Sequence, residues 1–195
     1  MIPARYRPFL AGAVVALAAG WFVLPHLFYK SVAQPLHFSH QTHVGEAVGM
    51  ACSDCHSFTE EGTFTGIPPT TQCADCHAAA IGESPAESTL VDEYITPGRE
   101  IPWLVYSRQP DNVYFSHIQH VNRAQLECSQ CHGDQGTASE LRPYRVNRIS
   151  GYSHDVSARR IAGLGGGPAH GLSMDDCMDC HKSKGAPNSC LTCHK

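Results

Sequence analysis

Hydrophobic residues are concentrated in one stretch near the start of the chain. No charged residue occurs between Phe9 and Phe28, a run of twenty positions. Because a helix rises about 1.5 Å per residue, roughly twenty apolar residues span the hydrocarbon core of a bilayer. Arg5 and Arg7 precede the run and Lys30 follows it. By the positive-inside rule, this pattern predicts a helix that crosses the membrane with its N-terminus in the cytoplasm.

This pattern divides the chain into three expected regions. They are a cytoplasmic N-terminus over residues 1–8, a transmembrane anchor over residues 9–29, and a periplasmic domain over residues 30–195. A cleaved signal peptide is the alternative, because Ser31-Val32-Ala33 resembles a small-residue cleavage site. Both interpretations place the large domain on the periplasmic side of the inner membrane.

The ten cysteines form five Cys-x-x-Cys-His motifs, and none is left over. This motif is the attachment signature of c-type haem, because two thiols add to the porphyrin vinyl groups and the histidine then binds the iron. Zinc fits less well, because five pairs do not divide into four-ligand sites, and disulfides do not fix this spacing. We therefore predict five haem c groups. The attachment thiols are Cys52, Cys55, Cys73, Cys76, Cys128, Cys131, Cys177, Cys180, Cys190 and Cys193, and the proximal histidines are His56, His77, His132, His181 and His194.

Five cofactors in about 160 residues leave too little protein for a separate apolar core around each one. Porphyrin faces would then supply much of the buried surface. The chain also contains 13 prolines and 17 glycines. We expect a multihaem cytochrome c fold that is mostly irregular, with short α-helices packed around the haems, almost no sheet, and one N-terminal transmembrane helix.

Eight histidines remain outside the motifs, whereas the chain has four methionines. A haem that transfers electrons usually has both axial positions filled, so five irons need up to five distal ligands. His40 and His43 are spaced i and i+3, as are His117 and His120, which puts each pair on one face of a helical turn. Because one porphyrin takes one distal histidine, we predict that each pair binds two different irons.

The two histidine pairs belong to an internal repeat. A Phe-Ser-His-x-x-His element precedes a Cys-x-x-Cys-His motif twice, and the histidines of the two copies are 77 residues apart. The fifth distal ligand stays open between His170, which lies in a glycine-rich stretch, and His154, with His37 as a weaker candidate.

The charge pattern excludes one class of function. The net charge is −4, and no basic run or aromatic-basic interleaving indicates nucleic-acid binding. Two linkers, 78–112 and 133–170, separate groups of motifs. They are either solvated loops whose arginines pair with haem propionates, or docking surfaces for partner subunits.

Two longer stretches resemble a known family. The stretches "FSHQTHVGEAVGMACSDCHSFTEEGTFTGIPPTTQCADCH" and "IPWLVYSRQPDNVYFSHIQHVNRAQLECSQCHG" are similar to the multihaem cytochrome c subunit of alternative complex III and of the related quinone reductase complex of sulfate reducers. The closing "MDDCMDCHKSKGAPNSCLTCHK" resembles the sulfate-reducer branch more closely. Class III cytochromes c share the Phe-x-His-x-x-His element, so the segment around Trp103 is the more specific part.

The resemblance implies an electron-transfer subunit of a membrane-bound quinone/quinol oxidoreductase complex, without a catalytic site of its own. It would relay electrons between the membrane quinone pool and periplasmic redox partners. The implied partners are an iron–sulfur/molybdopterin-type periplasmic subunit, quinone-binding membrane subunits, and a periplasmic cytochrome c or a similar redox protein.

Two other functions compete with this one. The first is a self-sufficient membrane-anchored quinol dehydrogenase that feeds a periplasmic reductase. The second is a multihaem reductase enzyme, which needs one iron with an open distal position. Eight histidines outside the motifs, for five irons, disfavour this enzyme.

Overall fold

The computed structural model describes residues 3–23, 27–105, 107–151 and 172–194. Short helices dominate the described residues, and the sheet that they form has two strands. This confirms the predicted fold of short helices with little sheet. The elements in chain order are η1 (Ala4–Tyr6), α1 (Arg7–Phe22), β1 (Tyr29–Val32), α3 (His40–Val44), α4 (Cys52–Cys55), α5 (Thr70–His77), α6 (Pro85–Thr89), η2 (Leu90–Ile95), η3 (Ile118–Arg123), α7 (Cys128–His132), η4 (Gln135–Thr137), β2 (Tyr144–Asn147), α10 (Met174–Lys184) and α11 (Cys190–Cys193). Here η1 and η4 are 3-10 helices, and η2 and η3 are π-helices.

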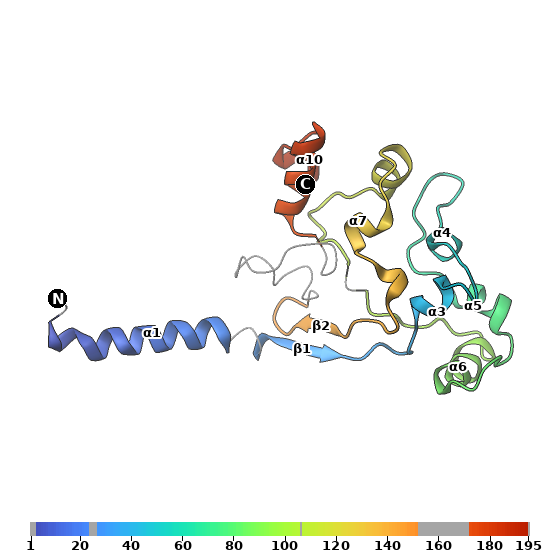
Figure 1. Ribbon diagram of the computed structural model, residues 1–195, viewed down its shortest axis with the longest axis horizontal. Coiled ribbons are helices and arrows are strands. Elements are labelled where there is room, and N and C mark those ends of the chain that lie inside the picture. The colour runs from blue at the N-terminus through green and yellow to red at the C-terminus, as the bar shows by residue number, and fades with distance from the viewer. Residues whose placement is uncertain (1–2, 24–26, 106, 152–171, 195) are drawn as a thin grey trace.

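Helix α1 points away from the rest of the molecule (Figure 1). Its 16 residues form about 24 Å of helix, which is shorter than a bilayer core of about 30 Å. Among the described residues, no helix is both long and apolar enough to cross a membrane. The transmembrane helix that we predicted over residues 9–29 is therefore not supported. One reason is that Tyr29 is not helical but pairs with Asn147 in the sheet.

Strands β1 and β2 lie next to the C-terminal end of α1 (Figure 1). They pair antiparallel, with Tyr29 opposite Asn147 and Val32 opposite Tyr144. The guanidinium of Arg145 lies 5.6 Å from the centroid of the Tyr29 ring. The sheet therefore connects the N-terminal segment to residues that are more than a hundred positions later in the chain.

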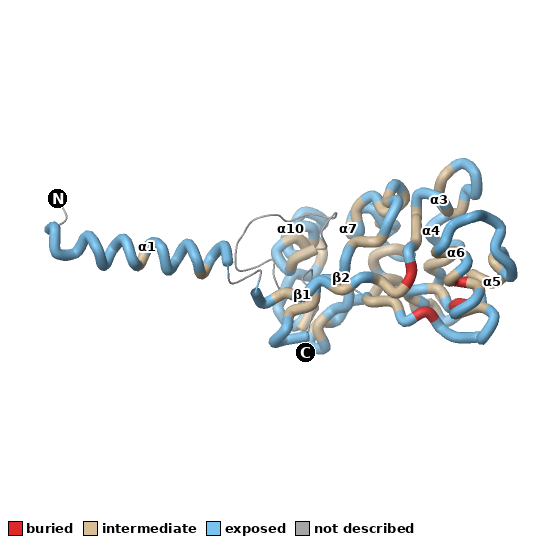
Figure 2. Tube along the Cα trace, turned by 90° about the horizontal axis from the view of Figure 1, so that it is seen from below, coloured by how far each residue is buried: buried red, intermediate tan, exposed pale blue. Residues whose placement is uncertain are grey.

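The cysteine motifs lie on short helices. Hydrogen bonds between neighbouring residues stabilise the start of three of these helices. In α4, the Asp54 carboxylate accepts a hydrogen bond from the Ala51 N–H, and in α7 the Gln130 side chain accepts one from the Glu127 N–H. Ser173 caps α10 in the same way, and each of these contacts satisfies an N–H group that the first helical turn leaves unpaired. Figures 1 and 2 both show α10, α7, α4 and α5 in this order from the side of α1 to the far side.

The hydrophobic core is small and lies toward α5 and α6 (Figure 2). Within the described residues, the buried hydrophobic side chains are Leu36, Leu90 and Ile101. The surface of 13785 Å² compares with about 9,100 Å² for a compact monomer of 21.2 kDa. The polypeptide by itself therefore buries little apolar surface, and its shape depends on specific local contacts.

One of these contacts connects the start of α5 to the core. Thr70 is 5% exposed, and its hydroxyl donates to a carboxylate oxygen of Glu100 at 3.1 Å. The same hydroxyl oxygen accepts the N–H of the buried Ile101 at 3.0 Å. A buried N–H that loses its partner carries the full cost of its desolvation.

We expect Thr70→Val to lower the free energy of unfolding by about 1–3 kcal/mol, because it leaves the Ile101 N–H buried without an acceptor. Denaturant unfolding of the haem-loaded protein measures this change. The matched control is Thr71→Val, because Thr71 is exposed on the same helix. Equal stability of the two variants would show that the buried hydroxyl contributes nothing.

Candidate functional site

The two Phe-Ser-His-x-x-His elements fold in the same way. The ring of Phe38 stacks on His43, with centroids 4.5 Å apart and planes at 17°, and stands edge-on to His40 at 4.9 Å. The copy around Phe115 repeats both contacts, at 4.7 Å for the stacked ring and 4.8 Å for the edge-on ring. The phenylalanine of the element therefore packs against both histidines and limits how their rings can turn.

Several histidine rings are also fixed through one ring nitrogen. When Nδ1–H donates to a fixed acceptor, the tautomer is set and Nε2 is left to bind a metal. This second contact is common around metal-binding histidines. The acceptors are the carbonyl oxygens of Ser39 for His43 (2.8 Å), Gly66 for His56 (2.7 Å), Ser116 for His120 (2.8 Å) and Pro187 for His181 (2.7 Å), and the carboxylate of Glu87 for His77 (2.8 Å).

Three pairs of rings from different segments face each other at similar distances. The centroid distances are 6.2 Å for His43 and His77, 6.3 Å for His117 and His132, and 6.0 Å for His120 and His181. Two imidazoles that bind one metal from opposite sides, with metal–nitrogen bonds of about 2.0–2.1 Å, have centroids roughly 6.3 Å apart. Each pair therefore has room for one metal ion between its rings.

The remaining histidine of the first repeat, His40, is described by its burial and its charge environment. Burial lowers the pKa of His40, and the neighbouring His56 lowers it further. The Nδ1 atom of His40 is buried and has no hydrogen-bond partner. Burial also lowers the pKa of His117. A lowered pKa keeps an imidazole neutral, which is the form that binds metals.

The members of each i, i+3 pair thus face different cysteine motifs. His117 faces the histidine of the third motif, and His120 faces that of the fourth. His43 faces His77 of the second motif, whereas His40 lies near the first. This is the geometry that two separate irons for each pair would require.

The fifth motif is held differently in the described part of the chain. The backbone of His194 forms an isolated β-bridge with Val113, and the Tyr114 N–H donates to the carbonyl of Cys193 at 2.7 Å. His154 and His170, the predicted candidates for its distal ligand, lie outside the described residues. His37, the weaker candidate, has an exposed side chain.

The cysteine motifs form a continuous series of neighbours. None of the ten cysteines forms a disulfide, and each of them lies in the described residues. The Gln72 side chain on α5 donates to the Asp54 carbonyl oxygen in the first motif. Phe64 stacks on His56 of the first motif and on His117, which faces His132 of the third. His120, on the element before the third motif, faces His181 of the fourth, and the Asn188 side chain, next to the fifth motif, donates to the Met178 carbonyl oxygen in the fourth. The series therefore runs from the second motif through the first, third and fourth to the fifth.

Comparison with known proteins identifies the family. The "menaquinone reductase, multiheme cytochrome c subunit" of Nitratidesulfovibrio vulgaris is 36% identical over 203 aligned residues, which cover 96% of this chain and 89% of the relative. The chain belongs to this family of multihaem cytochrome c subunits. Residues 113–195 of this multihaem cytochrome c also match the family of cytochrome c7 and related cytochrome c.

Haem c is the cofactor class of a cytochrome c, and the histidine geometry fits it. A haem iron takes two axial ligands from the protein, as the facing ring pairs could provide. In the described part of the multihaem cytochrome c, no group of three or more His, Cys, Asp or Glu side chains could hold a metal ion. The arrangement suits haem iron, whose four remaining positions belong to the porphyrin, better than a structural zinc ion.

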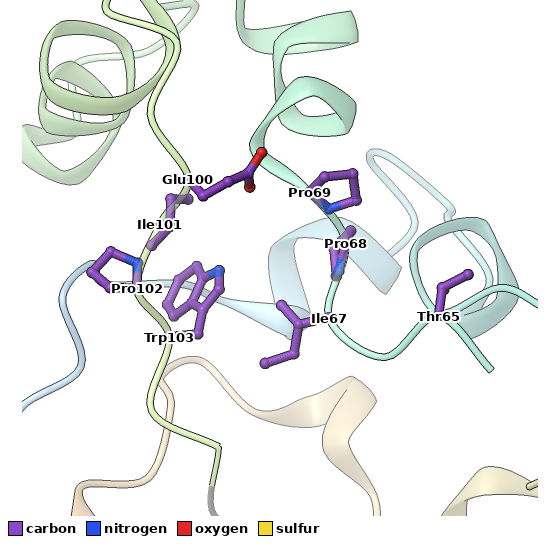
Figure 3. Close-up of a pocket in the computed structure, with 8 residues that line it drawn as sticks. All are labelled: Thr65, Ile67, Pro68, Pro69, Glu100, Ile101, Pro102 and Trp103. Carbon is purple, nitrogen blue, oxygen red and sulfur yellow. The ribbon is translucent and has the colours of Figure 1, made fainter.

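The segment around Trp103 contributes an apolar wall next to the first histidine pair. Figure 3 shows the cavity, about 490 Å³ in volume, between the Ile67–Pro69 side and the Glu100–Trp103 side. The Trp103 ring contacts Phe38 edge-on at 6.4 Å. The Gln34 side chain holds the next residue by two hydrogen bonds to the Leu104 backbone, at 2.9 and 3.0 Å.

Glu87 is a functional candidate that the sequence did not reveal. Its carboxylate accepts hydrogen bonds from the His77 ring and from the Ile81 and Gly82 N–H groups. The Ile81 N–H contact and the His77 contact lower the pKa of Glu87, so the group stays a carboxylate. No motif marks a residue ten positions after His77, because the contact depends on how residues 81–87 fold back.

Proposed function

We propose that this chain is an electron-relay subunit that carries five haem c groups in a row. Its attachment thiols are the ten cysteines, and its proximal ligands are the five histidines that end the motifs. The proposed distal ligands are His40 for the first motif, His43 for the second, His117 for the third and His120 for the fourth. For the fifth motif the candidates remain His170 and His154.

The observation that carries this proposal is the unbroken series of neighbouring motifs. A hydrogen bond or a ring contact joins each motif, or the segment beside it, to the next motif in the series. Haem iron supplies one-electron chemistry when bound. The side chains keep the cofactors side by side, so an electron that enters at one end can leave at the other.

The histidines also favour conduction over catalysis. Facing rings at about 6 Å would fill both axial positions of an iron and exclude a substrate from it. The phenylalanines of the two repeats hold the distal rings in place, which keeps those positions closed. The chain therefore moves electrons, and its partners perform the chemistry on quinones.

The relative's name, a menaquinone reductase subunit, supports a place in a membrane complex. We place the haem domain on the periplasmic face of the inner membrane, between the quinone pool and periplasmic redox partners. Its proposed neighbours are quinone-binding membrane subunits, an iron–sulfur/molybdopterin-type subunit, and a periplasmic cytochrome c or similar protein. Helix α1, which is apolar and exposed along most of its length, is the segment through which the chain associates with the membrane.

A pyridine haemochrome assay of the purified chain should give five haems per polypeptide, because each of the five cysteine pairs binds one porphyrin. The double variant Cys73→Ala/Cys76→Ala should give four. A value of three or fewer haems per polypeptide for the unaltered chain would contradict the proposal of five haems in a row.

Exchanging the distal histidines one at a time tests which irons they bind. His117→Met and His120→Met should each raise the midpoint potential of one haem, because methionine ligation raises the potential relative to histidine. A spectroscopic redox titration should show that the two variants affect different haems. Gln119→Met is the control, because this exposed side chain lies between the two histidines and is no ligand candidate, so the potentials should not change. A shift of the same haem in both variants would refute the assignment of two irons to one pair.

The relay role itself is tested on the complex. When the chain is purified from membranes with its partners, a menaquinol analogue should exchange electrons with its haems. The chain purified alone should not react with the same analogue, because quinone binding is assigned to the membrane subunits. Oxidation of the analogue by the isolated chain would instead support a self-sufficient quinol dehydrogenase.

A further inference from the structure

One histidine in the series has an acceptor that differs from the others. The His77 ring and the Glu87 side chain are 23% and 12% exposed, and their Nδ1 and Oε1 atoms lie 2.8 Å apart. Oε1 also accepts the Ile81 N–H at 2.9 Å, and Oε2 accepts the Gly82 N–H at 2.8 Å. Both carboxylate oxygens are therefore held in place, so the negative charge stays beside the ring.

The other described rings with a bonded Nδ1 contact backbone carbonyl oxygens. This holds for the motif histidines His56 and His181 and for His43 and His120 of the repeats. A carbonyl oxygen carries a partial charge, whereas a carboxylate carries a full one. A carboxylate partner makes the imidazole a more basic, more electron-donating metal ligand.

We propose that Glu87 is a positioning residue that lowers the reduction potential of the haem attached to Cys73 and Cys76, below that of the haems at the first, third and fourth motifs. The inference rests on the proposed function. Ferric iron carries one positive charge more than ferrous iron, so a more basic ligand stabilises the ferric form. Reduction at this motif adds one electron to the iron.

The position of this motif gives the effect a direction. The second motif is one end of the series, because Gln72 on its helix contacts Asp54 of the first motif. Helix α5, which carries it, lies on the side of the molecule far from α1 (Figures 1 and 2). An electron is least stable at this end, so it moves toward the interior motifs once it has entered there.

The test is Glu87→Gln in the full haem-loaded chain. Glutamine has the same length and can still accept the His77 N–H, but it removes the full charge. We expect the ferric preference of one haem to fall about tenfold, which raises its midpoint potential by about 59 mV for a one-electron couple. A spectroscopic redox titration and the g-values of the low-spin ferric signal both report this change.

The control is Glu93→Gln, which removes the same charge from an exposed position on η2. It should leave the potentials unchanged. Equal shifts of the midpoint potential in the two variants would show that only long-range charge acts on the haem, and this result would overturn the proposal. An unchanged midpoint potential in Glu87→Gln would also overturn it. The haem that moves should be the one that moves in His43→Met, and a different haem would also overturn it.

Two further measurements separate this inference from the proposed function. Haem stoichiometry and low-spin spectra report attachment and ligation of the haems. If both are unchanged in Glu87→Gln and the midpoint potentials are unchanged too, the inference about Glu87 fails while the proposed function stands. If Glu87→Gln does not fold, Glu87→Asp replaces it, because aspartate is one methylene shorter and withdraws the carboxylate from the His77 ring. This variant should raise the same potential, and an unchanged potential would again overturn the proposal.

Discussion

The whole structure depends on pairs of imidazole rings held about 6 Å apart by segments that are distant in sequence. A metal–nitrogen bond tolerates little error, so each ring must be fixed in position and in rotation. The chain meets this demand with local contacts, namely a stacked phenylalanine and a hydrogen bond to Nδ1. It therefore needs no large core, and three buried hydrophobic residues are found in the described part of the chain.

The small hydrophobic core also explains why the protein suits electron transfer. A domain with a thick apolar core would separate its cofactors, whereas here hydrogen bonds and ring contacts join successive motifs. One short helical element orients two rings toward two different motifs. The repeated Phe-Ser-His-x-x-His element is therefore the unit that orients the histidine rings, and the rest of the chain connects these units.

The sequence was most informative where chemistry fixes the spacing. The Cys-x-x-Cys-His motifs and the i, i+3 histidine pairs depend on neighbouring residues. The motifs predicted short helices, and the pairs predicted histidines that bind two different irons. It was least informative where distant segments meet. The pairing of Tyr29 with Asn147, which conflicts with the predicted anchor, leaves no local signal. The same holds for Glu87, which looks like any surface glutamate until the loop before it folds back on His77.

The small sheet at the base of α1 determines the order in which the molecule can assemble. Strand β1 cannot pair until β2 has been synthesised, more than a hundred residues later. Proteins emerge from the ribosome N-terminus first, so the first three cysteine pairs are synthesised before β2. The pairing of β1 with β2 is therefore a late step that follows the synthesis of these motifs.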